Sequence, residues 1–224
     1  MNRSAILLCA CLLYGCGQAR RAGEPVAVFT ELPPGEEPLV DVRKIDPRIR
    51  VAIPYVTADN FTGRALYPAN LALLRTSVAR RLSAVQDELV RLKLGLKVLD
   101  AYRPWSIQCL MWEAVPDENY VADPNKGSRH NRGAAVDVTL VDANGNELEM
   151  PSRHDEFTER SRADYKGGSA ASRRNRDYLI RVMRRQGFEV LATEWWHFDA
   201  PGWERFSVLD VPLTDPPTGT RPGG

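Results

Sequence analysis

The sequence has few cysteines. Only four occur among its 224 residues, and three of them, Cys9, Cys11 and Cys16, lie near the N-terminus. The body of the chain keeps a single cysteine, Cys109, which excludes a disulfide framework there. Because Cys109 has apolar neighbours, we expect it to be a small buried hydrophobic side chain. The fold must therefore depend on its core or on a metal.

An excess of charge of one sign is also missing. Thirty Lys and Arg residues face 29 Asp and Glu residues, giving a formal charge of +1. Nucleic-acid binders concentrate positive charge to displace counterions from phosphates, so no nucleic-acid partner is expected. Hydrophobic residues make up 43% of the chain. This content predicts a folded core and excludes a disordered, collagen-like or multi-span membrane protein.

The N-terminus resembles an export signal. A short positive start precedes an apolar run from Ala5 to Tyr14, which is too short to span a bilayer. Residues 13–16, Leu-Tyr-Gly-Cys, also resemble a bacterial lipoprotein signal in which Cys16 carries the lipid. We expect a signal peptide over residues 1–15 and an exported protein, either periplasmic or anchored to the membrane through lipidated Cys16.

The rest of the chain divides by composition. Residues 16–39 are rich in Gly, Pro and charge without an apolar period, which favours a flexible N-terminal arm. Residues 40–210 carry the periodic segments and predict one domain of ordinary size. Residues 211–224 contain Pro, Gly and Thr and are expected to be a disordered tail.

Apolar periodicity predicts alternating helices and strands within this domain. A helix capped by Asn70 and ended by Gly95 is expected over residues 71–92, followed by a strand over 96–101 and a helix over 105–114. A strand over 134–141 leads into an Asn-Gly hairpin turn. The pattern ends with a helix over 172–186, stopped by Gly187, and a strand over 188–198.

Two of the three histidines lie in unusual contexts. His130 stands in a loop seven residues before Asp137, which projects from the polar face of the following strand. His197 ends the run Glu194-Trp195-Trp196-His197. Two imidazoles and a carboxylate leave a fourth tetrahedral position for water, as in catalytic zinc sites. We therefore predict that His130, Asp137 and His197 bind one zinc ion.

Glu194 is the candidate general base, but its position raises a geometric problem. On a regular strand, residues 194 and 197 point to opposite faces, so the backbone must supply a bulge or a strong twist. Arg103, at the end of a predicted strand, is a candidate for stabilising the oxyanion of a tetrahedral intermediate. Each feature also has a purely structural interpretation: chance spacing, a packed histidine beside tryptophans, or an ordinary ion pair of Arg103.

Together these motifs resemble a known family. The pattern Ser128-x-His130-x-Arg132-Gly133-x-Ala135-x-Asp137, the run Glu194 to His197, and Asp100-Ala101-Tyr102-Arg103-Pro104 are similar to those of the D-alanyl-D-alanine dipeptidases, the vancomycin-resistance type of zinc D,D-peptidase. The resemblance covers roughly residues 40–203. It implies an α+β fold with a central antiparallel sheet flanked by helices, Hedgehog/D,D-peptidase-like, with a zinc cleft.

The resemblance also implies roles for individual residues. His130, Asp137 and His197 would hold one Zn²⁺, Glu194 would act as base and then acid, and Arg103 would stabilise the transition state. Ser128 and Asp155 match the positions that hold the two charged ends of a dipeptide. The segment around them departs from the family pattern, which has Gly in place of Pro151 and Phe in place of His154. For His154 two interpretations stay open, a residue that lines the pocket and a surface-loop histidine without a catalytic duty, and we favour the second.

The sequence thus predicts an exported zinc dipeptidase that cleaves D-Ala-D-Ala, and it implies no protein partner. A D,D-carboxypeptidase or endopeptidase acting on peptidoglycan stem peptides is the alternative enzyme. A third hypothesis is a non-catalytic, zinc-stabilised module that binds cell wall. That module would need neither Glu194 nor an open ligand position.

Overall fold

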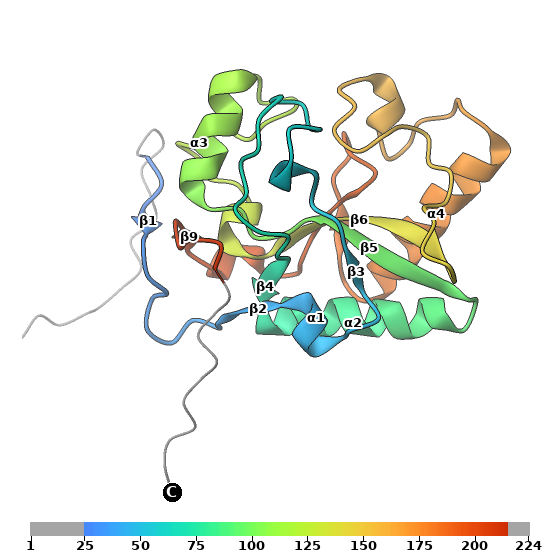
Figure 1. Ribbon diagram of the computed structural model, residues 1–224, viewed down its shortest axis with the longest axis horizontal. Coiled ribbons are helices and arrows are strands. Elements are labelled where there is room, and N and C mark those ends of the chain that lie inside the picture. Colours follow the sequence, from blue (N-terminus) through green and yellow to red (C-terminus); the bar gives the residue numbers. More distant parts are fainter. Residues whose placement is uncertain (1–24, 215–224) are drawn as a thin grey trace, which may run out of the picture.

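The computed structural model describes residues 25–214. Its central sheet has the strand order β3-β5-β6-β8-β7, and helices lie on both sides of it (Figure 1). The strands are β3 (Arg50–Val51), β5 (Leu94–Asp100), β6 (Ala135–Asp142), β8 (His197–Asp199) and β7 (Glu189–Val190). Only β3 and β5 are parallel; the other neighbours are antiparallel. The α+β class is confirmed, with a mixed rather than a wholly antiparallel sheet.

The helices largely follow the predictions. They are α1 (Val42–Ile45), α2 (Thr76–Val90), α3 (Trp105–Ala114) and α4 (Ala170–Arg185), with short 3-10 turns η1 (Pro54–Val56), η2 (His130–Arg132), η3 (Glu159–Ser161) and η4 (Trp203–Arg205). The predicted bounds of α3 are confirmed. Gly187 follows α4 with a φ of 82°, the left-handed conformation that ends helices. Cys109, in α3, is half-buried rather than fully buried.

The predicted start of the long helix is wrong. Residues Leu73–Arg75 form strand β4, which pairs with β2 (Leu39–Asp41), and α2 begins only at Thr76. Asn70 therefore caps no helix. Its side chain instead accepts from the backbone nitrogen of Ile53 and donates to the carbonyl of Val51. Gly95 also does not end the helix, because it lies within β5.

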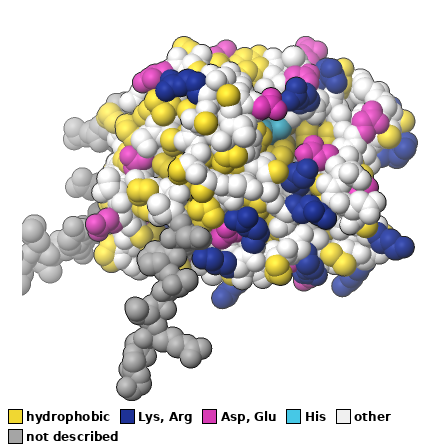
Figure 2. Space-filling model, viewed as in Figure 1, with side chains coloured by type: hydrophobic (Ala, Val, Ile, Leu, Met, Phe, Trp, Pro, Cys, Tyr) yellow, Lys and Arg dark blue, Asp and Glu magenta, His cyan; other side chains and the backbone are white. Residues whose placement is uncertain are grey.

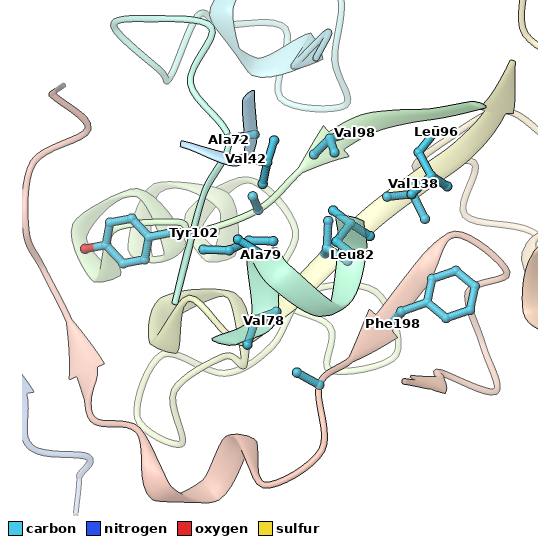
Figure 3. Packing of buried hydrophobic residues seen from close by; sticks show 14 of the residues in the cluster. Val42, Ala72, Val78, Ala79, Leu82, Leu96, Val98, Tyr102, Val138 and Phe198 are labelled. Atoms are coloured by element: carbon cyan, nitrogen blue, oxygen red, sulfur yellow. The ribbon is translucent and has the colours of Figure 1, made fainter. Parts of the chain in front are cut away.

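The core lies between α2 and the sheet. Val78, Ala79 and Leu82 of α2 are buried and face the strands that carry Val98 and Val138 (Figure 3). Burying these side chains removes apolar surface from water at roughly 25 cal/mol per Å². This packing fixes β6 from one side, so that the residues alternating with Val138 point to the opposite side of the sheet.

The strand predicted over residues 188–198 is instead a hairpin. β7 and β8 pair antiparallel, with Glu189 opposite Asp199, and the chain turns between them. Within the turn, the backbone nitrogen of Glu194 donates to the carbonyl of Leu191. The turn removes the geometric problem of a regular strand, because Glu194 and His197 no longer alternate across one strand.

The N-terminal segment is packed where the structure describes it. β1 (Val28–Phe29) pairs in parallel with β9 (Val208–Leu209), and Glu36 forms a 2.7 Å ion pair with the fully buried Arg75. The prediction of a flexible arm is therefore wrong for residues 25–39. Residues 16–24 and the predicted signal peptide lie outside the described residues.

The C-terminal boundary also shifts. The backbone nitrogen of Val211 donates to the hydroxyl of Tyr102, and Leu213 is buried. The predicted disordered tail is therefore wrong at its first residues, and residues 215–224 lie outside the described part. Among residues 25–214, no helix combines the length and apolar character needed to cross a membrane.

Candidate active site

One cavity of ≈ 540 Å³ gathers the predicted functional residues. It lies where β5 ends and β6 begins, on the side of the sheet away from α2. Its lining includes all seven of them: Arg103, Ser128, His130, Asp137, Asp155, Glu194 and His197. Figure 2 shows a small part of a histidine side chain reaching the surface, beside acidic and basic side chains. Residues separated by more than ninety positions in the chain thus meet at one site.

The predicted ligand set converges within this cavity. Nε2 of His130 lies 3.0 Å from Nδ1 of His197. Oδ1 of Asp137 lies 3.3 Å from the first nitrogen and 3.0 Å from the second. All three side chains are buried, and their nearest donor atoms lie within 4.8 Å of one another. Two nitrogens and one carboxylate oxygen form a donor set that suits Zn²⁺.

Hydrogen bonds on the outer ring nitrogens favour metal binding by the inner nitrogens of His130 and His197. Nδ1 of His130 lies 2.7 Å from the carbonyl of Ala101, and Nε2 of His197 lies 3.0 Å from Oδ1 of Asp199. In the neutral rings these outer nitrogens donate, which leaves a lone pair on each inner nitrogen. Two lone pairs facing each other beside a carboxylate are stabilised by a shared cation. The residues present therefore fit a zinc ion.

The loop before β6 is shaped to place His130. Its 3-10 turn ends at Gly133, which has a φ of 65°. This left-handed conformation favours glycine, and a Cβ there would also force the end of the Leu39 side chain to move. The buried Asn131 holds the loop by donating to the carbonyl of Arg103 and accepting from the backbone nitrogen of Ser128.

Glu194 reaches the ligand cluster from the β7–β8 turn. Its Oε2 lies 3.9 Å from Nδ1 of His197, and its side chain is only 17% exposed. Burial is the main cause that raises the pKa of Glu194 to about 7, and the nearby Asp137 contributes in the same direction. A carboxyl group with this pKa can both accept and release a proton near neutral pH.

Arg103 follows β5 and enters the cavity from its floor. Its guanidinium forms a buried ion pair with Asp100 at 2.5 Å and donates to the side chain of Gln108 at 2.8 Å. Asp100 in turn accepts from the hydroxyl of Tyr67. Arg103 thus forms an ion pair, but a buried one that lines the cavity. These supporting partners were not identified from the sequence.

The two predicted substrate residues occupy the cavity wall. The hydroxyl oxygen of Ser128 accepts from the backbone nitrogen of His130 at 3.2 Å, which leaves its own proton available for donation. Asp155 accepts from the hydroxyl of Tyr55 at 2.5 Å. Burial raises the pKa of Tyr55 well above its ordinary value, so that this hydroxyl keeps its proton.

The predicted surface position of His154 is wrong. Its side chain is only 9% exposed, and its two ring nitrogens face Asp137 and Asp155. Burial opposes its charge, but these carboxylates outweigh burial and raise the pKa of His154 to about 9. No periodic signal marks this segment, and only the departure of His154 from the family pattern drew attention to it.

Comparison with known proteins agrees with these observations. Residues 35–212 match the family described as D-ala-D-ala dipeptidase, peptidase family M15. A D-alanyl-D-alanine dipeptidase of Escherichia coli (strain K12) is 41% identical over 175 residues, covering 76% of this chain and 89% of that protein. One from Enterococcus faecalis is 35% identical, with 72% and 86% covered.

Among solved structures, the chain is similar to a variant of the vancomycin-resistance D,D-pentapeptidase VanY from a VanB-type resistance cassette, in complex with Zn(II). The identity is 17% and the TM-score 0.40, with 62% of this chain and 78% of that chain covered.

The chain is an enzyme of the metallopeptidase class. Within that class it belongs to the D-ala-D-ala dipeptidase family, as its motifs predicted.

Proposed function

We propose that the protein hydrolyses the dipeptide D-Ala-D-Ala to free D-alanine with one zinc ion held by His130, Asp137 and His197. The convergence of these three donor groups beside Glu194 carries the proposal. Zinc, when bound, supplies Lewis acidity and lowers the pKa of bound water to about 7. The names of the relatives support the choice of dipeptide.

Glu194 moves the proton in this reaction. As a carboxylate it accepts a proton from the attacking water, and as a carboxylic acid it returns that proton to the departing amine nitrogen. Both roles require a pKa near the working pH, and burial places the pKa of Glu194 at about 7. The turn between β7 and β8 holds the carboxylate beside the ligands without placing it among them.

Arg103 stabilises the negative charge that develops on the carbonyl oxygen. Its fixed guanidinium acts at low reorganisation cost, because Asp100 and Gln108 already hold it in the cavity. Asp155 offers the counter-charge for the substrate ammonium, and the Ser128 hydroxyl can donate to the substrate carboxylate. This arrangement favours a free dipeptide over a peptide whose amino end is acylated.

The test measures release of D-alanine by zinc-loaded protein from D-Ala-D-Ala, from N-acetyl-D-Ala-D-Ala and from L-Ala-L-Ala. We expect turnover of the first substrate only, lost on chelation and restored by zinc. Glu194→Ala should retain zinc while losing turnover. Preference for the acetylated peptide would instead assign the protein to the D,D-carboxypeptidases, and failure to cleave any D,D-substrate would refute the proposal.

We further propose that the protein is exported, with Cys16 as the site of lipid attachment. The sequence of residues 13–16 supports this. Mass spectrometry of the mature N-terminus from the membrane fraction tests it. A lipid-bearing Cys16 at the mature N-terminus is the expected result. An N-terminus that carries no lipid would contradict lipidation.

A further inference from the structure

His154 stands between the proposed zinc ligands and the proposed binding site for the substrate ammonium, although the reaction described above makes no use of it. Its Nε2 lies 3.2 Å from Oδ2 of Asp137, and its Nδ1 lies 3.4 Å from Oδ2 of Asp155. One imidazole ring therefore contacts a metal-ligand candidate on one side and a substrate-binding candidate on the other.

The two oxygens of the Asp137 carboxylate contact different partners. Oδ1 faces His130 and His197, at 3.3 Å and 3.0 Å, whereas Oδ2 faces His154. A donor on Oδ2 fixes the rotation of the carboxylate and holds Oδ1 toward the two other ligands. Partners of this kind orient ligands and tune metal affinity.

The contact to Asp155 fixes a strained position. Asp155 has a φ of 54°, a left-handed conformation that is uncommon for residues other than glycine. Its Oδ2 accepts a hydrogen bond from the Tyr55 hydroxyl at 2.5 Å and lies 3.4 Å from Nδ1 of His154. These two contacts on one oxygen hold the side chain in the wall of the cavity.

Aromatic packing prevents the His154 ring from turning away. Its centroid lies 5.3 Å from that of Trp196, at an interplanar angle of 71°, and 6.3 Å from that of Tyr55, at 64°. Edge-to-face contacts of this kind are favourable and directional. The ring is therefore held with Nε2 hydrogen-bonded to Asp137 and Nδ1 close to the carboxylate of Asp155.

We propose that His154 is a positioning residue that fixes Asp137 for zinc and Asp155 for the dipeptide ammonium at the same time. The role of His154 toward Asp137 is argued from the geometry of the ligand cluster. Its role toward the dipeptide rests on the proposed function. A single ring thereby couples the binding of metal to the binding of substrate.

Three substitutions separate the two contacts. His154→Phe keeps an aromatic ring and removes both nitrogens. In His154→Gln the amide nitrogen takes the place of Nε2, and in His154→Asn it takes the place of Nδ1. Arg153→Gln is the matched control, because the neighbouring Arg153 side chain is 84% exposed. Zinc affinity is measured by competition with a chromogenic chelator, and kcat and KM are measured on D-Ala-D-Ala.

We expect His154→Phe to lower zinc affinity by about 10- to 100-fold and to raise KM. His154→Gln should keep zinc affinity within about 3-fold of the parent while KM rises. His154→Asn should lower zinc affinity while KM stays close to the parent value. Arg153→Gln should change neither quantity. Thermal unfolding of the metal-free variants identifies any that do not fold; if His154→Phe is one, the Gln and Asn pair decides.

Unchanged zinc affinity and KM in folded His154→Phe would overturn the proposal, as would equal effects of Gln and Asn on both quantities. If the parent binds zinc but does not cleave the dipeptide, the proposed function fails. The zinc affinities then still test the contact with Asp137. A parent protein that binds no zinc would overturn both the proposed function and the positioning role of His154.

Discussion

The two halves of the cavity wall are built differently. Two of the three proposed ligands stand on the sheet, because Asp137 lies in β6, His197 begins β8, and the two are paired in register. The third, His130, lies in the short turn η2 directly before β6. The other half includes Asp155, which contacts the neighbouring His154. Both residues stand on the segment between β6 and α4, whose only helical element is the short turn η3. Sheet residues are fixed by backbone pairing and core packing, whereas the loop residues depend on contacts between side chains.

This difference separates two kinds of effect. Substitutions on the sheet half should act on metal binding and on the rate of the chemical step. Substitutions on the loop half should act mainly on how well the substrate is held.

The largest effect is expected for Asp137→Asn. An amide in place of the carboxylate removes the negative charge and one of the two oxygens that contact the three histidines. We expect zinc to be lost and kcat/KM to fall by about 10⁴-fold or more. Metal analysis alongside kinetics checks this, and an active, zinc-loaded Asn variant would show that the sheet half does not hold the metal.

Arg103→Lys should have the next largest effect. Lysine keeps the positive charge but loses the planar fork that contacts Asp100 and Gln108 together. We expect kcat to fall by about 10²-fold, with zinc content unchanged and KM altered much less. A rise in KM at constant kcat would place Arg103 in substrate binding instead.

On the loop half, Asp155→Asn should weaken binding of the free dipeptide. Loss of the counter-charge is expected to raise KM by about 10-fold while zinc affinity stays at the parent value. Steady-state kinetics with the dipeptide and its N-acetyl form check this. Equal loss for both substrates would remove Asp155 from ammonium recognition.

The smallest effect concerns stability and follows from the raised pKa of Glu194. The unfolded chain releases this proton near the ordinary value of 4.5, whereas the folded chain holds it until about pH 7. Stability of the metal-free protein therefore falls as pH rises through this range. Glu194→Gln should melt about 3 °C or more above the parent at about pH 8, and close to it at about pH 5. Equal differences at both pH values would contradict a buried, raised-pKa carboxyl.

The sequence predicted the sheet half well because its signals are local. The alternation of β6 places Asp137 opposite the residues packed on α2, and two histidines with unusual neighbours could be paired with it. The turn that carries Glu194 was missed because residues 191–196, Leu-Ala-Thr-Glu-Trp-Trp, contain no Gly, Pro or Asn to mark it. The apolar run from Leu71 to Leu74 fits a strand as well as a helix, which moved the start of α2.

The loop half was harder to predict for a physical reason. Nothing periodic links His154 to Asp137, and the contact exists only because the segment before α4 folds back over the sheet. The partners of Arg103 are likewise set by tertiary packing, since Gln108 reaches it from α3. Such contacts follow from the fold and have no spacing of their own in the sequence.

The most direct test of the zinc site is anomalous diffraction at the zinc absorption edge from crystals grown with zinc. We expect one strong peak per chain, within about 2.0–2.2 Å of Nε2 of His130, Nδ1 of His197 and an oxygen of Asp137. A peak elsewhere in the molecule, with none among these three side chains, would contradict the proposed zinc site.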